Sequence, residues 1–160
     1  MRWTIASQST PQILSNPDGL KLFMKQIGNV VCAVIVNNDE ILIAQRNKMG
    51  SLGGFWEFPG GKVEKKESNE DALHRELLEE LDLEITIVKK LDPVEHSSEN
   101  YTLTLIPYLC TVGGRGIVVR EHQSVKWTVT SKFDEFEFAP ADIPIVEQLK
   151  ILNINELLVG

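Results

Sequence analysis

Three glutamates stand at helical spacing in the middle of the chain. Glu79 and Glu80 follow Glu76 by three and four residues, so on a regular helix their carboxylates share one face. A solvated helix face usually carries Lys or Arg four residues after each glutamate, but positions 80, 83 and 84 are Glu, Leu and Glu. Crowded oxygen ligands favour hard divalent cations, so the spacing predicts a Mg²⁺ site that can also take Mn²⁺.

One basic residue adjoins this cluster. Arg75 points about 100° away from Glu76 on a regular helix. It is therefore expected to hold a neighbouring loop and not to neutralise the glutamates, with Glu67 as its natural partner. The cluster would then lack a cation of its own, which strengthens the prediction of a metal site.

A helix over 68–82 has to carry the glutamates. Ser68 is a good N-cap with Asp71 three residues later, and Leu73, Leu77, Leu78 and Leu81 form an apolar stripe at helical spacing. The preceding segment 59–62, Pro-Gly-Gly-Lys, is predicted to be a loop whose glycines let the main chain approach a ligand.

The remaining pattern predicts a mixed sheet with helices on its faces. Strands are expected at 30–36, 41–44, 55–58, 85–91, 101–112, 117–119 and 124–129, with turns at 16–19 and 113–116. A short helix is expected from apolar residues between 20 and 27, and a second helix over 142–152.

Composition limits the class of protein. A chain of 160 residues with 42% hydrophobic residues is expected to form one domain. The net charge of −7, without a basic run, argues against nucleic-acid binding. The longest apolar run, 30–36, is too short to span a membrane, and the separated Cys32 and Cys110 are expected to be buried thiols. We expect a cytoplasmic protein, as a monomer or homodimer.

Residues 61–83 resemble the Nudix box, G-x5-E-x7-R-E-U-x-E-E-x-G-U, in which U is a bulky aliphatic residue. The positions in register are Gly61, Glu67, Arg75, Glu76, Leu77, Glu79, Glu80 and Leu83. Asp82 replaces the motif's last glycine, where a positive φ is expected that Asp tolerates better than most residues. The flanking segments 56–62 and 139–144 are similar to the MutT branch, so the resemblance covers about residues 29–152.

The resemblance implies an α/β/α sandwich and assigns roles to individual residues. It makes residues 29–160 the hydrolase domain and residues 1–28 an N-terminal extension. Metal ligands would be the Gly60 carbonyl, Glu76, Glu79, Glu80 and Glu121, with Glu79, Glu80 or Glu121 as the base, while Glu67 and Arg75 would brace the loop against the helix. Substrate would contact Arg46, Glu57, Phe58, Lys62 and Asp142. None of the three histidines is assigned a role.

The implied reaction is Mg²⁺-dependent hydrolysis of a nucleoside triphosphate to a nucleoside monophosphate and pyrophosphate, the water attacking in line. Asp142 is either the N-cap of the last helix or the residue that reads the base. As an ionised acceptor it would favour an amino-bearing base such as cytosine, or a damaged nucleotide. Hydrolysis of ADP-ribose or a nucleotide sugar, and a non-catalytic nucleotide sensor, are the alternatives.

Overall fold

The computed structural model describes residues 11–15, 21–114 and 116–159. Its centre is a mixed sheet of strand order β4-β3-β2-β8-β6, with β1 and β5 paired to β2, β7 to β8 and β9 to β3. The strands are β1 Pro11–Ser15, β2 Lys21–Asn37, β3 Glu40–Gln45, β4 Trp56–Glu57, β5 Gly60–Lys62, β6 Thr86–Lys90, β7 Val94–Ser97, β8 Tyr101–Thr111 and β9 Ser124–Thr128.

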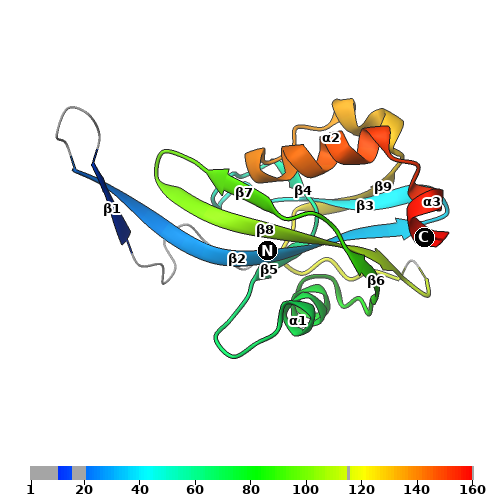
Figure 1. Cartoon of the computed structure of the whole chain (residues 1–160). Helices are drawn as coiled ribbons and strands as arrows, with labels where there is room; N and C mark the ends of the chain where they lie inside the picture. Colours follow the sequence, from blue (N-terminus) through cyan, green and yellow to red (C-terminus); the bar gives the residue numbers. More distant parts are fainter. Residues whose placement is uncertain (1–10, 16–20, 115, 160) are drawn as a thin grey trace.

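Helices cover both faces of the sheet, which confirms the predicted α/β/α sandwich (Figure 1). The helices are α1 Asn69–Leu81, α2 Ile143–Ile151 and α3 Ile154–Val159, with 3-10 turns η1 Thr130–Glu135 and η2 Pro140–Asp142. Figure 1 places α1 on one side of the sheet and α2 on the other. Of the described residues, no helix is long and apolar enough to cross a membrane.

Strand β2 contributes to two hydrophobic cores, one on each face of the sheet. It pairs in parallel with β8 along Lys25–Val36 and antiparallel with β1, β3 and β5. Its even-numbered residues from Val30 to Val36 belong to the core on the α2 side. Its odd-numbered residues from Val31 to Ile35 pack with the leucines of α1. The strand predicted for the apolar run 30–36 is therefore confirmed, and it is buried on both faces, as suits a run of apolar and β-branched residues.

Helix α1 begins and ends as its sequence predicts. The Ser68 hydroxyl accepts a hydrogen bond from the Asp71 N–H at 3.0 Å. Leu73, Leu77 and Leu81 are fully buried, whereas Leu78, expected in the same stripe, is 42% exposed. Asp82 ends the helix in the left-handed region with φ 52° and ψ 40°, as expected at the position where the motif has glycine.

The short helix expected from residues between 20 and 27 is wrong for the described part, residues 21–27, which belong to β2. Their backbone pairs antiparallel with β1, where Leu14 faces Leu22, and from Lys25 onward in parallel with β8. This hairpin projects beyond the rest of the sheet (Figure 1). Residues 1–10 of the predicted extension, and the turn predicted at 16–19, lie outside the described residues.

Two further predictions are corrected. Residues 117–119 form no strand, because the N–H groups of Val118 and Arg120 donate to the Leu81 and Glu80 carbonyls, both at 2.9 Å. Residues 60–62 are not a loop but strand β5, in register with Val30–Cys32. Strand β7 and helix α3 were not predicted, and Arg115 of the turn predicted at 113–116 lies outside the described residues.

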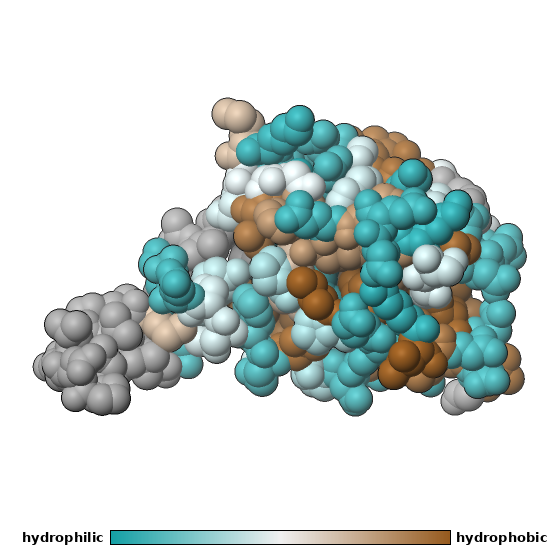
Figure 2. All heavy atoms as spheres, turned by 90° about the horizontal axis from the view of Figure 1, so that it is seen from above, coloured by the Kyte–Doolittle hydropathy of each residue, from teal (hydrophilic) through white to brown (hydrophobic). Residues whose placement is uncertain are grey.

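The surface on the α2 side intersperses hydrophobic and hydrophilic residues (Figure 2). Exposed apolar side chains on and after α2 include Ile143, Ile151 and Leu152, which are 45%, 84% and 42% exposed. Single exposed apolar residues of this kind are normal for globular proteins.

The left-handed residue at the end of α1 gives a stability prediction. Asp82→Gly should leave the free energy of unfolding unchanged or raise it by up to about 1 kcal/mol, because glycine adopts a positive φ without strain. Asp82→Val should lower it by about 1–2 kcal/mol. Urea denaturation measures both. Asp82→Asn is the control for the exposed pair with Arg120, at 3.5 Å, and equal stabilities of the Gly and Val variants would contradict the argument.

Candidate active site

The glutamates of α1 are positioned by two glycines of β5. Glu76 and Glu80 are 2% and 0% exposed, and the Glu79 side chain is 32% exposed. A Cβ at Gly61 would overlap the Glu76 carboxylate, and a Cβ at Gly60 would overlap the Val31 carbonyl oxygen. The absence of a side chain at Gly60 and Gly61 therefore lets a carboxylate lie directly against the strand.

Burial makes the negative charges of this pair unfavourable. It raises the pKa of Glu80 well above its usual value of 4.5, and the charges of Glu57 and Glu76 act in the same direction. The pKa of Glu76 is also raised by burial, against the opposing effect of a hydrogen bond from Arg75. Among the described residues, Glu76 Oε2 has no hydrogen-bond partner. The surroundings of Glu76 and Glu80 therefore favour a proton or a bound cation at these carboxylates.

The expectation that Arg75 does not neutralise the glutamates of α1 is wrong. Its Nε and Nη2 donate to the two Glu67 oxygens at 2.7 and 2.9 Å, and Nη2 also donates to the Lys62 carbonyl at 3.2 Å. Its Nη1 donates to Glu76 Oε1 at 2.8 Å and to Glu79 Oε2 at 3.4 Å. The long side chain thus both braces the loop and partly neutralises the helix.

Arg75 also affects the metal geometry and the partner carboxylates. Its hydrogen bond lowers the pKa of Glu67, which keeps that pair ionised. In this side-chain arrangement, no three Asp, Glu, His or Cys groups of the described residues form a ready-made metal site. Coordination by all three helix glutamates would require Glu79 to leave its contact with Arg75.

A second set of buried polar side chains lies next to Glu76 and Glu80. Glu57 of β4 is fully buried, and its Oε1 accepts from Arg46 Nη1 at 3.0 Å. Its Oε2 lies 3.3 Å from His122 Nε2, and His122 Nδ1 lies 3.9 Å from Glu80 Oε2. His122 was assigned no role from the sequence, because its partner Glu57 is 65 residues away. No local pattern marks such a residue.

Asp142 occupies the N-cap position of α2, but its side chain does not cap the helix and makes no capping hydrogen bond to it. Instead its Oδ1 accepts from the Phe58 N–H at 3.0 Å, which ties the start of α2 to the end of β4. Burial, and secondly the charge of Glu57, raise the pKa of Asp142 well above its usual value. Burial of this carboxyl group therefore disfavours its charged form.

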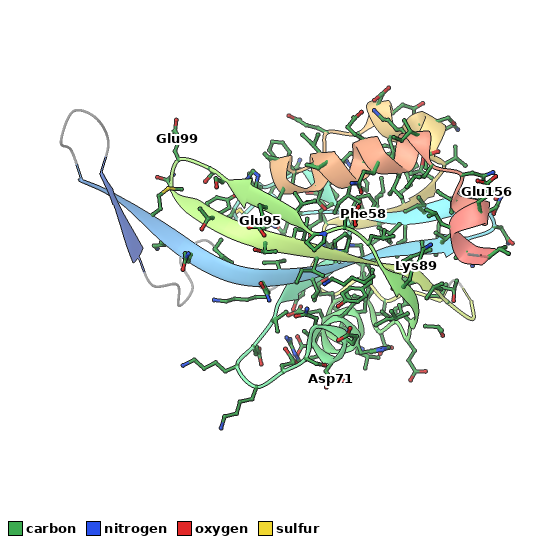
Figure 3. The ribbon with its side chains drawn as sticks, in the orientation of Figure 1. Phe58, Asp71, Lys89, Glu95, Glu99 and Glu156 are labelled. Carbon is green, nitrogen blue, oxygen red and sulfur yellow. The ribbon has the colours of Figure 1, made fainter. Side chains whose placement is uncertain are left out.

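The other predicted substrate residues lie around β4 and β5. The Phe58 ring is fully buried in the core and stacked on Phe138, so this residue contributes its backbone N–H to the region. Figure 3 shows Phe58 between the sheet and α2. Lys62 is half-buried at the end of β5. Glu121 is half-buried next to Arg120, whose N–H donates to the Glu80 carbonyl at 2.9 Å. Main-chain bonds thus bring the 120–122 segment to the end of α1.

A cavity of about 380 Å³ lies elsewhere in the fold. It lies between the end of β6 and helices α2 and α3, where Lys89, Leu91 and Leu149 contribute to its lining. None of the predicted site residues lines it. We therefore do not assign this cavity to the substrate.

Comparison with known proteins identifies the family. Residues 30–148 match the model described as the NUDIX domain, and the chain belongs to this family of hydrolases. It is 36% identical to the CTP pyrophosphohydrolase of Escherichia coli, over 81% of the chain and 96% of that protein. It is 37% identical to a putative 8-oxo-dGTP diphosphatase 2 of Mycobacterium tuberculosis, over 71% and 81%.

A solved structure supports the same conclusion. The MutT protein of a methicillin-resistant Staphylococcus aureus, a Nudix hydrolase, is 40% identical to the chain, with a TM-score of 0.64. The comparison covers 79% of this chain and 97% of that protein. The sandwich, the motif and the relatives agree on a MutT-like Nudix hydrolase.

From the burial of Glu80 we predict that its replacement by glutamine stabilises the protein, by an amount that depends on pH. Because its pKa is raised in the folded state, the folded protein binds more protons than the unfolded chain, and stability is lost as pH rises from about 4.5. Glu80→Gln should therefore stabilise the metal-free protein at pH 7.5, with a gain that shrinks toward pH 4.5. Urea denaturation in chelator measures this, with the exposed Glu84→Gln as control. A gain independent of pH would contradict it.

Proposed function

We propose that the chain hydrolyses a nucleoside triphosphate to a nucleoside monophosphate and pyrophosphate with the help of Mg²⁺. The observation that carries the proposal is the buried pair Glu76 and Glu80, of which Glu76 packs against Gly61. Two carboxylates in a place that disfavours their charge are expected where a cation is bound in the working state. The similarity to a CTP pyrophosphohydrolase and to a putative 8-oxo-dGTP diphosphatase supports the substrate class.

The donor set fits Mg²⁺. Glu76 has a buried oxygen without a hydrogen-bond partner among the described residues, Glu80 lies one turn further on, and Glu79 would leave its 3.4 Å contact with Arg75. With the Gly60 carbonyl and Glu121 these are oxygen ligands, the kind that Mg²⁺ and Mn²⁺ prefer. When bound, Mg²⁺ supplies charge neutralisation of the phosphates and a lower pKa for a coordinated water.

The protein's own residues account for the remaining steps. Arg46, held by Glu57 and by the Ser51 carbonyl at 2.8 Å, binds the phosphates. A glutamate carboxylate accepts a proton as the oxygen of water bonds to phosphorus in line. The bond from that phosphorus to the oxygen bridging the α- and β-phosphates breaks as the new bond forms. Glu67 and Arg75 keep the β5–α1 loop in place during this step.

Asp142 reads the base in this proposal. Its Oδ1 is fixed by the Phe58 N–H, which leaves Oδ2 for a ligand. A base amino group that donates to Oδ2 favours the carboxylate and so opposes the pKa increase caused by burial. Cytosine N4 and the amino groups of damaged bases meet this requirement. A cytoplasmic nucleotide pool is the corresponding location, in agreement with the free thiols Cys32 and Cys110.

The proposal predicts the effect of removing single charges. Glu79→Gln and Glu80→Gln should each lower kcat by about 100-fold or more, because each removes a metal ligand or the base. Both variants should remain folded. Released pyrophosphate and monophosphate are measured over a nucleotide panel with Mg²⁺, with and without chelator, and exposed Glu84→Gln is again the control.

The same assay separates the alternatives. Release of a sugar phosphate in place of pyrophosphate would point to ADP-ribose or a nucleotide sugar. Tight Mg²⁺-dependent nucleotide binding without turnover would point to a sensor. Normal turnover by both glutamine variants, or activity indifferent to chelator, would refute the proposal.

Base selection is tested with a matched pair of substrates. Asp142→Asn keeps an oxygen for the Phe58 N–H but turns the second acceptor into an amide donor. The ratio of kcat/KM for CTP to that for UTP should fall by about 10-fold or more, because cytosine presents an amino group where uracil presents an oxygen. An unchanged ratio would remove Asp142 from base recognition.

A further inference from the structure

Four buried polar side chains connect the end of β3 with helix α1. Arg46 is 8% exposed, and the side chains of Glu57, His122 and Glu80 are 0%, 1% and 0% exposed. Each oxygen of Glu57 has a different neighbour, Arg46 at 3.0 Å and His122 at 3.3 Å. The other ring nitrogen of His122 faces Glu80 at 3.9 Å. Glu57 therefore cannot change its position without affecting both neighbours.

The backbone around His122 is fixed on both sides of the ring. The Arg120 N–H donates to the Glu80 carbonyl and the Gln123 N–H to the Gln45 carbonyl, both at 2.9 Å. Gln45 immediately precedes Arg46 in the chain. The segment thus spans the distance between the end of α1 and the end of β3, and it holds the imidazole between the two acids.

We infer that His122 is a positioning residue that sets the Glu80 carboxylate and the Arg46 guanidinium together, through Glu57. The inference rests on the proposed function, in which Glu80 holds the metal and Arg46 the phosphates. Outer partners of metal ligands typically contribute about 10–100-fold to metal affinity because they orient the ligands. Polar networks of this kind also couple their members energetically.

The two ring nitrogens permit a matched set of variants. His122→Gln keeps a donor near the position of Nε2, which faces Glu57. His122→Asn keeps one near the position of Nδ1, which faces Glu80. His122→Leu removes both contacts and preserves an apolar volume. His74→Gln, on an exposed part of α1, is the matched control.

The test is Mn²⁺ binding without nucleotide, measured by electron paramagnetic resonance of the free ion. His122→Leu should weaken the affinity by about 10-fold or more. At least one of the Gln and Asn variants should recover most of it, and His74→Gln should match the unaltered protein. Unfolding curves of all variants show which are folded, and the Gln and Asn variants decide the question if the Leu variant is not.

A double-mutant cycle tests the connection to Arg46. Arg46→Gln should weaken Mn²⁺ binding in the unaltered protein, and it should do so by a smaller factor when His122 is already Leu or Asn. Equal effects in both backgrounds, or unchanged Mn²⁺ affinity in every His122 variant, would overturn the inference. No Mn²⁺ binding by the unaltered protein would instead refute the proposed function.

Discussion

The site depends on the close approach of β5 to α1. Strand β5 pairs with β2 at the place where a side chain on Gly60 would overlap the Val31 carbonyl, and a side chain on Gly61 would take the space of the Glu76 carboxylate. No L-residue larger than glycine fits either position without movement of the backbone or of Glu76. Gly60 and Gly61 therefore let the sheet and the acidic face of the helix lie in direct contact.

Hydrophobic packing makes this arrangement stable enough to exist. Leu73, Leu77 and Leu81 of α1 form a fully buried layer with Val31, Ala33 and Ile35 of β2. Each buried leucine contributes about 1.5–3 kcal/mol. Burial of Glu76 and Glu80 works against folding, since it raises the pKa of both. The protein thus holds its acids in an unfavourable place because they belong to a helix that buried leucines anchor to the sheet, a common trade between stability and function.

The sequence predicted the features that depend on local spacing, such as the Ser68 cap, the left-handed Asp82 and the buried run of β2. It failed where distant partners decide. The segment 117–119 has strand-like residues, but the N–H groups of Val118 and Arg120 donate to carbonyls at the end of α1. Those carbonyls need partners outside the helix. Residues 21–27 likewise became strand because β1 and β8 supply backbone partners.

Short strand β4 connects the two parts of the site, Asp142 at the start of α2 and the acids of α1. No local sequence pattern could reveal this arrangement. The N–H of Phe58, just after β4, holds Asp142 at the start of α2, while the Glu57 side chain lies between Arg46 and His122. Burial raises the pKa of both Asp142 and Glu80, and the charge of Glu57 adds to this increase. Asp142 and Glu80 therefore both lie within the electrostatic influence of one buried carboxylate. Phe58 contacts Asp142 on the α2 side, and Glu57 reaches the acids of α1 through His122.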